Sequence, residues 1–298
     1  TMFRDEKHRK KKGQFYLSVT YDYPAFPPKD NGLYQAIDLG INNTVCAVNM
    51  DAKFFEIGNP RQDLYWNPII DSIQSRRDHC KKTTEKVKGI IEYVDKKGQK
   101  KEKEIEKKTT EVSNRWVELN GNKKKCHDKC SNQIEDGQHK WSDKMVKNTR
   151  ANTIIVGDLS VKEMAQSGVK IQVKDKNDET KIIKVKSKRL NRSTQNQGYL
   201  SRFVGFLTYK AQKIGKRVIE ISEKNTTKRC YTCGKLHDMS LSQRTMMCDC
   251  GNIIDRDRNS AVNIMLDFLL KYNLSKSLKT FINNLGREGL LTPIWIKI

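Results

Sequence analysis

Four cysteines between residues 230 and 250 form the most specific chemical pattern in the sequence. Cys230 and Cys233 make a CxxC pair, Cys248 and Cys250 make a CxC pair, and a linker of hairpin length separates them. Two such pairs can place four thiolates tetrahedrally around Zn²⁺, at about 2.3 Å from the ion. The glycine that follows each pair suits a turn that aims backbone amides at the sulfurs. We therefore predict a zinc ribbon whose ion is structural, because protein ligands fill all four positions.

The remaining cysteines form weaker patterns. The segment 126–130, "CHDKC", and the segment 78–80, "DHC", each combine cysteine with histidine. A second metal site is one interpretation of them, and solvated thiols on a helix surface are the interpretation we favour. Cys46 lies in an expected strand and is predicted to belong to the core.

Two aspartates stand where catalytic acids of metal-dependent enzymes are found. Asp38 lies within the buried-type run "AIDLG", and such an acid is costly unless it meets a cation or a hydrogen-bond donor. Asp257 begins the apolar helix expected after the ribbon. Mg²⁺ prefers several converging carboxylates, which these residues could supply. The alternative for the second position is that Asp255 or Asp257 only caps the helix.

The stretch "NTIIVGDLS" raises a question about a further acid. Residues 153–156 are typical of a buried strand, but Gly157 leaves that strand and Asp158 follows one place later. Adjacent strand residues point to opposite faces, so Asp158 is a poor substitute for an acid at position 157.

The elements expected around these residues define an α/β fold with a mixed sheet. The run 32–50 indicates a strand, a turn and a second strand, and "FFEIGNP" indicates a third. Apolar residues recur at helical spacing from Leu200 onward and predict a helix that ends at Gly215. The run "KRVIEIS" after it predicts a further strand. Strands that alternate with helices in this way predict helices layered on a sheet.

A charged insertion is expected between the early strands and "NTIIV". The segment 71–148 is rich in lysine and glutamate and largely helical in pattern. Within it, residues 85–108 resemble an inserted hairpin around a glycine-containing turn. Their mixed charges fit either a solvated hairpin or an arm that faces nucleic acid.

The charge of the chain favours a polyanionic partner. Its 298 residues include 58 Lys and Arg against 35 Asp and Glu, a formal net charge of +23 spread along the sequence. No apolar run reaches the roughly 18 residues of a membrane span, and no signal peptide is visible. We expect an intracellular protein, in cytoplasm or nucleoid in a prokaryote and in the nucleus in a eukaryote, with no membrane partner.

Taken together, four motifs resemble the RuvC nuclease and zinc-ribbon half of TnpB proteins, the transposon-encoded relatives of type V CRISPR effectors and Fanzor. They are "AIDLGINNTVCAV", "IIVGDLSV", "KRCYTCG…CDCG" and "DRDRNSAVNI". The resemblance implies an RNase H-like core, Mg²⁺ or Mn²⁺ as catalytic ions, and cleavage of DNA directed by a guide RNA. It implies that Asp38 is the first catalytic acid and Asp257 the third.

The second acid departs from the commonest family pattern, which has glutamate where this chain has Gly157. Some members resemble this chain in pairing "GDL" with a glutamate shortly before the zinc knuckle, and "EISEKNTTKRC" places Glu223 there. A neighbouring strand end can reach the same ions, because strands lie only about 4.8 Å apart. We predict that Glu223 is the relocated acid. A dead site, substitution by Asp158, and a role for Glu220 are the alternatives.

The resemblance also implies a division of the chain. Residues 1–30 are expected to be a remnant of a wedge β-barrel, with "QFYLSVTY" as a strand that lacks an earlier partner. Residues 31–229 would be the nuclease core, 230–251 the zinc ribbon, and 252–298 the closing helix and tail. The expected function is RNA-guided DNA endonuclease. The alternative is a nuclease-inactive protein that binds nucleic acid, and a strand-transferring transposase is a weaker one.

Overall fold

The fold is built on a five-stranded mixed sheet. The computed structural model describes residues 2–4, 15–17, 19, 26–40, 42–94, 100–158, 169–174, 180–185, 200–240 and 242–296. The strand order is β11-β8-β3-β4-β5, with β8 parallel to both β3 and β11, and β4 antiparallel to both β3 and β5. The strands are β3 (Tyr34–Leu39), β4 (Asn43–Asn49), β5 (Phe54–Gly58), β8 (Thr153–Asp158) and β11 (Arg217–Ser222). This sheet confirms the predicted α/β fold.

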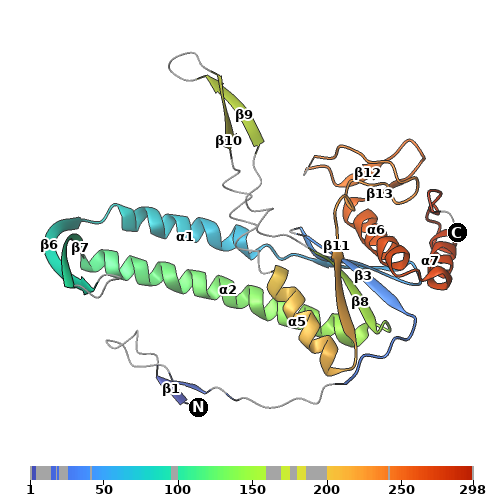
Figure 1. Cartoon of the computed structure of the whole chain (residues 1–298), viewed down its shortest axis with the longest axis horizontal. Coiled ribbons are helices and arrows are strands. Elements are labelled where there is room, and N and C mark those ends of the chain that lie inside the picture. Colours follow the sequence, from blue (N-terminus) through green and yellow to red (C-terminus); the bar gives the residue numbers. More distant parts are fainter. Residues whose placement is uncertain are drawn as a thin grey trace.

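Helices cover both faces of the sheet (Figure 1). On one face α6 (Arg256–Lys271) and α7 (Ser275–Arg287) pack against side chains that include Ala36, Cys46 and Ile155. On the other face α5 (Leu200–Lys213) and the end of α2 (Asn114–Asn148) pack against Ile37 and Ile154. The central strands are apolar on both sides for this reason, and Cys46 is a core residue as predicted.

The insertion consists of two helices with a β-hairpin between them. Helix α1 (Gln62–Asp78) lies beside α2, and the hairpin joins them at the end remote from the sheet (Figure 1). The hairpin strands β6 (Lys82–Val94) and β7 (Lys100–Val112) pair antiparallel over their whole length. The expectation of a largely helical segment is therefore wrong for residues 82–112, and the hairpin expected at residues 85–108 is confirmed by the paired strands. Their β-branched residues, which are interspersed with lysine and glutamate, suit a two-stranded ribbon.

Three further pairs of short strands lie outside the main sheet. They are β1 (Met2–Arg4) with β2 (Phe15–Leu17), β9 (Val169–Lys174) with β10 (Thr180–Val185), and β12 (Thr245–Met247) with β13 (Ile253–Asp255). Because β1 pairs with β2, the expectation that "QFYLSVTY" lacks an earlier partner strand is wrong. The rest of the proposed wedge remnant before residue 26, apart from residue 19, lies outside the described residues.

Candidate active site and cysteine centre

Asp38 lies on the face of the sheet that α6 covers. It is the fifth residue of β3 and is 6 % exposed. The hydroxyl of Ser260, on α6, donates a hydrogen bond to Asp38 Oδ1 at 2.9 Å. Burial raises the pKa of the Asp38 carboxyl well above its usual range, and the charges of Asp257 and Glu223 raise it further. A bound cation would stabilise the ionised form of an acid in these surroundings.

Glu223 fills the space that a side chain at position 157 would need. In the parallel register of β8 and β11, Ile221 pairs with Gly157, and Glu223 follows two residues later on the same face. A Cβ atom built on Gly157 would lie 2.5 Å from Glu223 Oε2 and 3.2 Å from both Glu223 Cβ and Ile264 Cδ1. The glutamate of the neighbouring strand therefore occupies the volume left free by the glycine.

The surroundings of Glu223 raise its pKa. Burial is the larger cause and the charge of Asp158 the second, and together they raise the pKa of Glu223 to about 7. Asp158 itself is the exposed last residue of β8. By strand alternation it belongs with Ile154 and Val156 on the α5 face, away from Asp38. The exposed Glu220 pairs with Val156 and belongs to that same face.

Asp257 and Asp255 have different roles at the start of α6. Asp255 is the N-cap, and its Oδ1 accepts hydrogen bonds from the amides of Asp257 at 2.8 Å and Arg258 at 3.3 Å. Asp257 is 6 % exposed and forms an ion pair with Arg244. Burial raises the pKa of the Asp257 carboxyl, and Arg244 partly offsets that increase. Asp255 therefore caps the helix, and the Asp257 carboxylate takes no part in the cap.

Replacing Asp255 by Ala should lower the free energy of unfolding by about 1 kcal/mol, because two amides at the start of α6 would lose their acceptor. Asp255→Asn keeps a capping oxygen and should cost much less. Urea unfolding followed by circular dichroism measures both changes. An equal loss in the two variants would show that Asp255 acts through its charge and not as a cap.

The three predicted acids are neighbours, but they do not form a single-ion chelate. The charges of Asp257 and Glu223 both raise the pKa of the Asp38 carboxyl, so the three acids lie near one another. Within the described ranges, three or more ligand atoms lie within 4.8 Å of one another only in the cysteine cluster, so the three carboxylates are more widely spaced. Carboxylates spaced this widely suit two ions better than one, since the ions of two-metal sites lie about 3.5–4 Å apart.

A hydrogen-bonded loop holds Glu223 in relation to α6. The side-chain amides of Asn259 and Asn263 both donate to the carbonyl oxygens of Thr226 and Arg229, at 2.6–3.2 Å. The Thr226 hydroxyl donates to the carbonyl of Glu223 at 2.9 Å. These contacts tie the end of β11 to the helix that carries Asp257.

The four predicted cysteines come together as one cluster. Their sulfur atoms all lie within 4.8 Å of one another, with Cys230 and Cys250 at 3.7 Å and Cys233 and Cys248 at 3.4 Å. Four thiolates about 2.3 Å from a tetrahedral Zn²⁺ would lie roughly 3.8 Å apart, so the donor set and its spacing fit zinc.

Backbone and side-chain donors surround the cysteine cluster. Burial alone would raise the pKa of Cys230, but hydrogen bonds from the Cys233 and Thr232 amides and the Asn252 side chain lower it to about 7. The glycines after the two pairs have φ of +78° and +88°, which other residues rarely adopt. These turns produce the arrangement of amides that the sequence predicted.

The segment after α7 packs against the cysteine unit, which the sequence analysis did not anticipate. The amide of Ile294 donates to the carbonyl of Thr232 at 2.7 Å, and Trp295 Nε1 donates to the carbonyl of Tyr231 at 2.7 Å. The Arg229 guanidinium lies 4.9 Å from the centre of the Trp295 ring. The signal in the sequence that could have identified this packed segment is the cluster of aromatic and aliphatic residues in "LLTPIWI".

The remaining cysteines form no second metal cluster in the part of the chain that the structure describes. Cys130 is buried between α1 and α2 with Trp66, Ile70 and Ile134, and Cys126 packs at the edge of this group. The favoured interpretation of 126–130 as solvated thiols is therefore wrong for Cys130. At helical spacing this thiol lies on the apolar stripe of α2 and behaves as a small hydrophobic residue.

Two residues near the acids were missed by the sequence analysis. Ser260 lies in the same helix motif as Asp257. Its place three residues later, on the same face of the helix, is the signal in the sequence that could have identified it. Arg244 precedes β12 within the linker of the cysteine unit, and no spacing rule connects it to Asp257. Their contacts depend on how the cysteine unit packs on α6.

The chain combines a mixed sheet, covered by helices on both faces, with a four-cysteine unit that contacts α6 through the ion pair of Arg244 with Asp257. Residues 201–264 match the family model described as "Cas12f1-like, TNB domain". Over 153 residues the chain is 31 % identical to TnpB-like protein L79 of Acanthamoeba polyphaga mimivirus, a match that covers 51 % of this chain and 26 % of that protein. Over these residues the chain is similar to TnpB-like proteins, which confirms the resemblance inferred from the motifs.

Two further similarities have lower sequence identity. The chain is 25 % identical over 143 residues to a putative RNA-guided DNA endonuclease of Streptomyces pristinaespiralis, covering 47 % of this chain and 30 % of that one. A solved Cas12f1–sgRNA–target DNA complex matches 83 % of this chain and 51 % of its own, with 14 % identity and a TM-score of 0.46. The chain thus spans less than a third of either sequence relative. Among the described helices, none has the length and apolar character needed to cross a membrane.

Proposed function

We propose that this chain is the nuclease portion of an RNA-guided DNA endonuclease of the TnpB type, which hydrolyses phosphodiester bonds. Asp38, Glu223 and Asp257 would hold Mg²⁺ or Mn²⁺, and Cys230, Cys233, Cys248 and Cys250 would hold a structural Zn²⁺. DNA and a guide RNA would be its partners. The support comes from the TnpB-like sequence, the sheet and the placement of these residues.

The observation that carries the proposal is the position of the Glu223 carboxylate. It lies over Gly157, on the middle of three parallel strands, and close enough to Asp38 to raise its pKa. A glutamate without a function would gain little from a half-buried place beside two other acids, because burial of a carboxylate is costly. Three acids gathered at one end of a sheet are typical of a cation site.

The residues of the chain would then have distinct tasks. Divalent ions bound here would activate water and stabilise the leaving oxygen of the phosphodiester. Ser260 holds the Asp38 carboxylate in one orientation through its hydrogen bond. Arg244 neutralises part of the charge on Asp257, and the amides of Asn259 and Asn263 fix the loop that begins at Glu223.

The rival function is binding of nucleic acid without cleavage. Purifying the chain from its host with any bound RNA, sequencing that RNA, and testing cleavage of a matching duplex in Mg²⁺ separates the two. The nuclease proposal expects cleavage that EDTA abolishes, together with Mn²⁺ binding seen by electron paramagnetic resonance. A complex that binds the duplex tightly, leaves it intact and takes up no Mn²⁺ would establish the rival.

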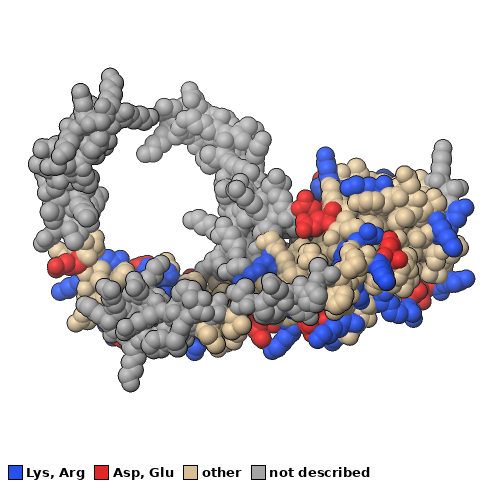
Figure 2. Space-filling model, turned by 60° about the horizontal axis from the view of Figure 1, so that its bottom comes forward, with Lys and Arg blue, Asp and Glu red and all other residues tan. Residues whose placement is uncertain are grey.

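Basic side chains are candidates for the phosphate contacts. Figure 2 shows Lys and Arg spread over the visible face of the described residues and not collected in one place. A groove of about 360 Å³ between α1 and α2 is lined by the cations Arg76, Arg115, Lys125 and Lys129 beside one acid, Glu118. This groove lies in the charged insertion, between its two helices.

Binding of double-stranded DNA should weaken steeply with salt, because each neutralised phosphate releases a counterion. With about six phosphate contacts the affinity should fall roughly 10³-fold between 50 and 200 mM salt. Changing both Lys125 and Lys129 to Gln should lower the salt slope by up to about 2. The matched control changes the exposed Lys276 and Lys279 on α7 to Gln and should leave the slope unchanged. A flat affinity across this salt range would contradict a functional role for the basic surplus.

A further inference from the structure

A second hollow lies on the face of the sheet opposite the acids. It encloses about 200 Å³ where the end of α2 meets the start of β3, the end of β4 and the start of β5. Gln35 is three residues before Asp38 on β3, so the two Cα atoms are about 10 Å apart along the strand. By alternation their side chains point to opposite faces. The hollow is therefore separate from the candidate active site.

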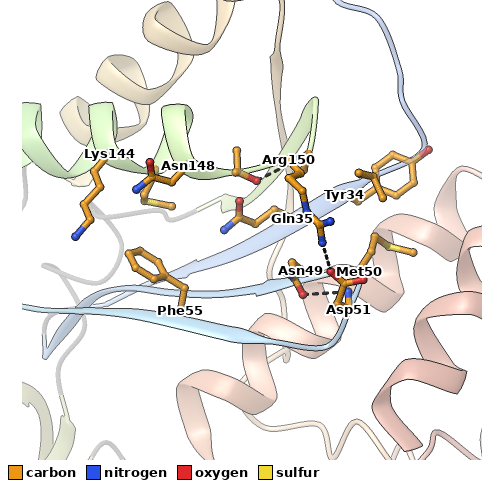
Figure 3. A pocket seen from close by; sticks show the side chains of 13 residues that line it. Tyr34, Gln35, Asn49, Met50, Asp51, Phe55, Lys144, Asn148 and Arg150 are labelled. Carbon is orange, nitrogen blue, oxygen red and sulfur yellow. Dashed lines mark hydrogen bonds and ion pairs between the residues drawn. The ribbon is translucent and has the colours of Figure 1, made fainter. Parts of the chain in front are cut away.

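The hollow contains a buried polar group without a partner. Gln35 is 8 % exposed, and its Oε1 meets no hydrogen-bond donor within the described residues. In Figure 3 the Gln35 amide lies between Asn148, at the end of α2, and the ring of Phe55. A buried amide left unpaired costs free energy, so a ligand that satisfies it would gain correspondingly. A ligand able to do so must reach into the hollow.

The other walls of the hollow are aromatic and cationic. Phe55 is 38 % exposed, which is unusual for a large apolar side chain on a sheet that helices cover. Lys144 and Arg150 lie at the rim, and Arg150 forms an ion pair with Asp51 across it. The hollow is smaller than the roughly 300–1,000 Å³ of pockets for drug-sized ligands, so its occupant has about the size of one ring system.

From this combination we infer that the hollow binds one unpaired nucleobase of a nucleic-acid strand. Every base has a face that can stack on Phe55 and an edge with a donor beside an acceptor, which the two ends of a glutamine amide can match. Lys144 and Arg150 are placed to attract the adjoining phosphate. The inference rests on the proposed nucleic-acid binding of the chain and is independent of cleavage.

The test uses methyl NMR of the full chain labelled at methionine, because Met145 lines the hollow and belongs to the core on the same face of the sheet. Adenosine 5′-monophosphate should shift the Met145 methyl signal, and ribose 5-phosphate, which lacks the base, should not. Phe55→Ala should weaken the mononucleotide at least about 5-fold, since stacking on an aromatic side chain is typically worth that much. Tyr65→Ala removes an exposed ring on α1 and should leave binding unchanged.

Gln35→Leu separates a binding role from a structural one. It replaces the unpaired amide by an apolar group of similar size, so binding should weaken while the melting temperature stays the same or rises. The unliganded methyl spectrum of each variant checks that it folds. Equal shifts with ribose 5-phosphate, or no shift with the mononucleotide at millimolar concentration, would overturn the inference even if long oligonucleotides bind. Trinucleotides of RNA and DNA with the same bases then identify the strand by the tighter affinity.

Discussion

Replacing Glu223 by Gln should abolish Mg²⁺-dependent cleavage while nucleic-acid binding survives. Gln keeps the shape of the side chain over Gly157 and removes the charge that would hold the ion. Loss of an outer-shell partner of a metal site typically costs 10- to 100-fold, so loss of a ligand should cost more than about 100-fold. Cleavage of a matching duplex and Mn²⁺ binding by electron paramagnetic resonance measure the two consequences separately.

The matched control is Asp158→Asn, which removes a nearby charge from the opposite face and should have a much smaller effect. A stricter test moves the acid back to the strand. Gly157→Glu alone should fail, because its Cβ would lie 2.5 Å from Glu223 Oε2. Gly157→Glu combined with Glu223→Gly should recover part of the lost activity. Normal cleavage with Gln at position 223 would refute the role of this residue.

The second large effect is expected at the cysteine cluster. Cys230→Ser should reduce the zinc content from about one ion per chain to none. Structural zinc contributes about 10–16 kcal/mol to the folding of zinc-finger peptides at pH 7, more than a unit of this size can recover from packing. The cysteine unit, residues 230–251, should then unfold around the buried Met246. Elemental analysis measures the ion, and the Met246 methyl signal reports the folding.

Cys80→Ser provides the control for this prediction, because Cys80 is partly exposed on the surface and outside the cluster. It should leave the zinc content unchanged. A Cys230→Ser protein that contains no zinc and still shows a native Met246 signal would mean that the cysteine unit folds by packing alone.

The sequence predicted the parts of the fold that depend on local pattern. The runs around Asp38 and "NTIIV" are apolar on both faces of a strand, so their burial could be predicted before the structure was known. The cysteine spacing likewise predicted which thiols would meet. Residues 82–112 are an intermediate case: the glycine-containing turn indicated a hairpin at residues 85–108, but the charged segment around it was grouped with its helical neighbours.

The rest of the candidate site depends on register and packing. Which residue of β11 lies beside Gly157 is decided by how two parallel strands pair, and 58 residues separate these strands in the chain. The ion pair of Arg244 with Asp257 likewise requires the cysteine unit to pack on α6. Family resemblance indicated Glu223, but periodicity alone left Asp158 and Glu220 open.

The crowding at Gly157 also bears on how such a site could arise by single substitutions. Positions 157 and 223 compete for one volume, so a glutamate can occupy it from either strand but not from both. Passage from one arrangement to the other therefore crosses an intermediate that is either crowded or lacks the acid. That intermediate acts as a barrier to reversion, and related chains should show the two positions changing together.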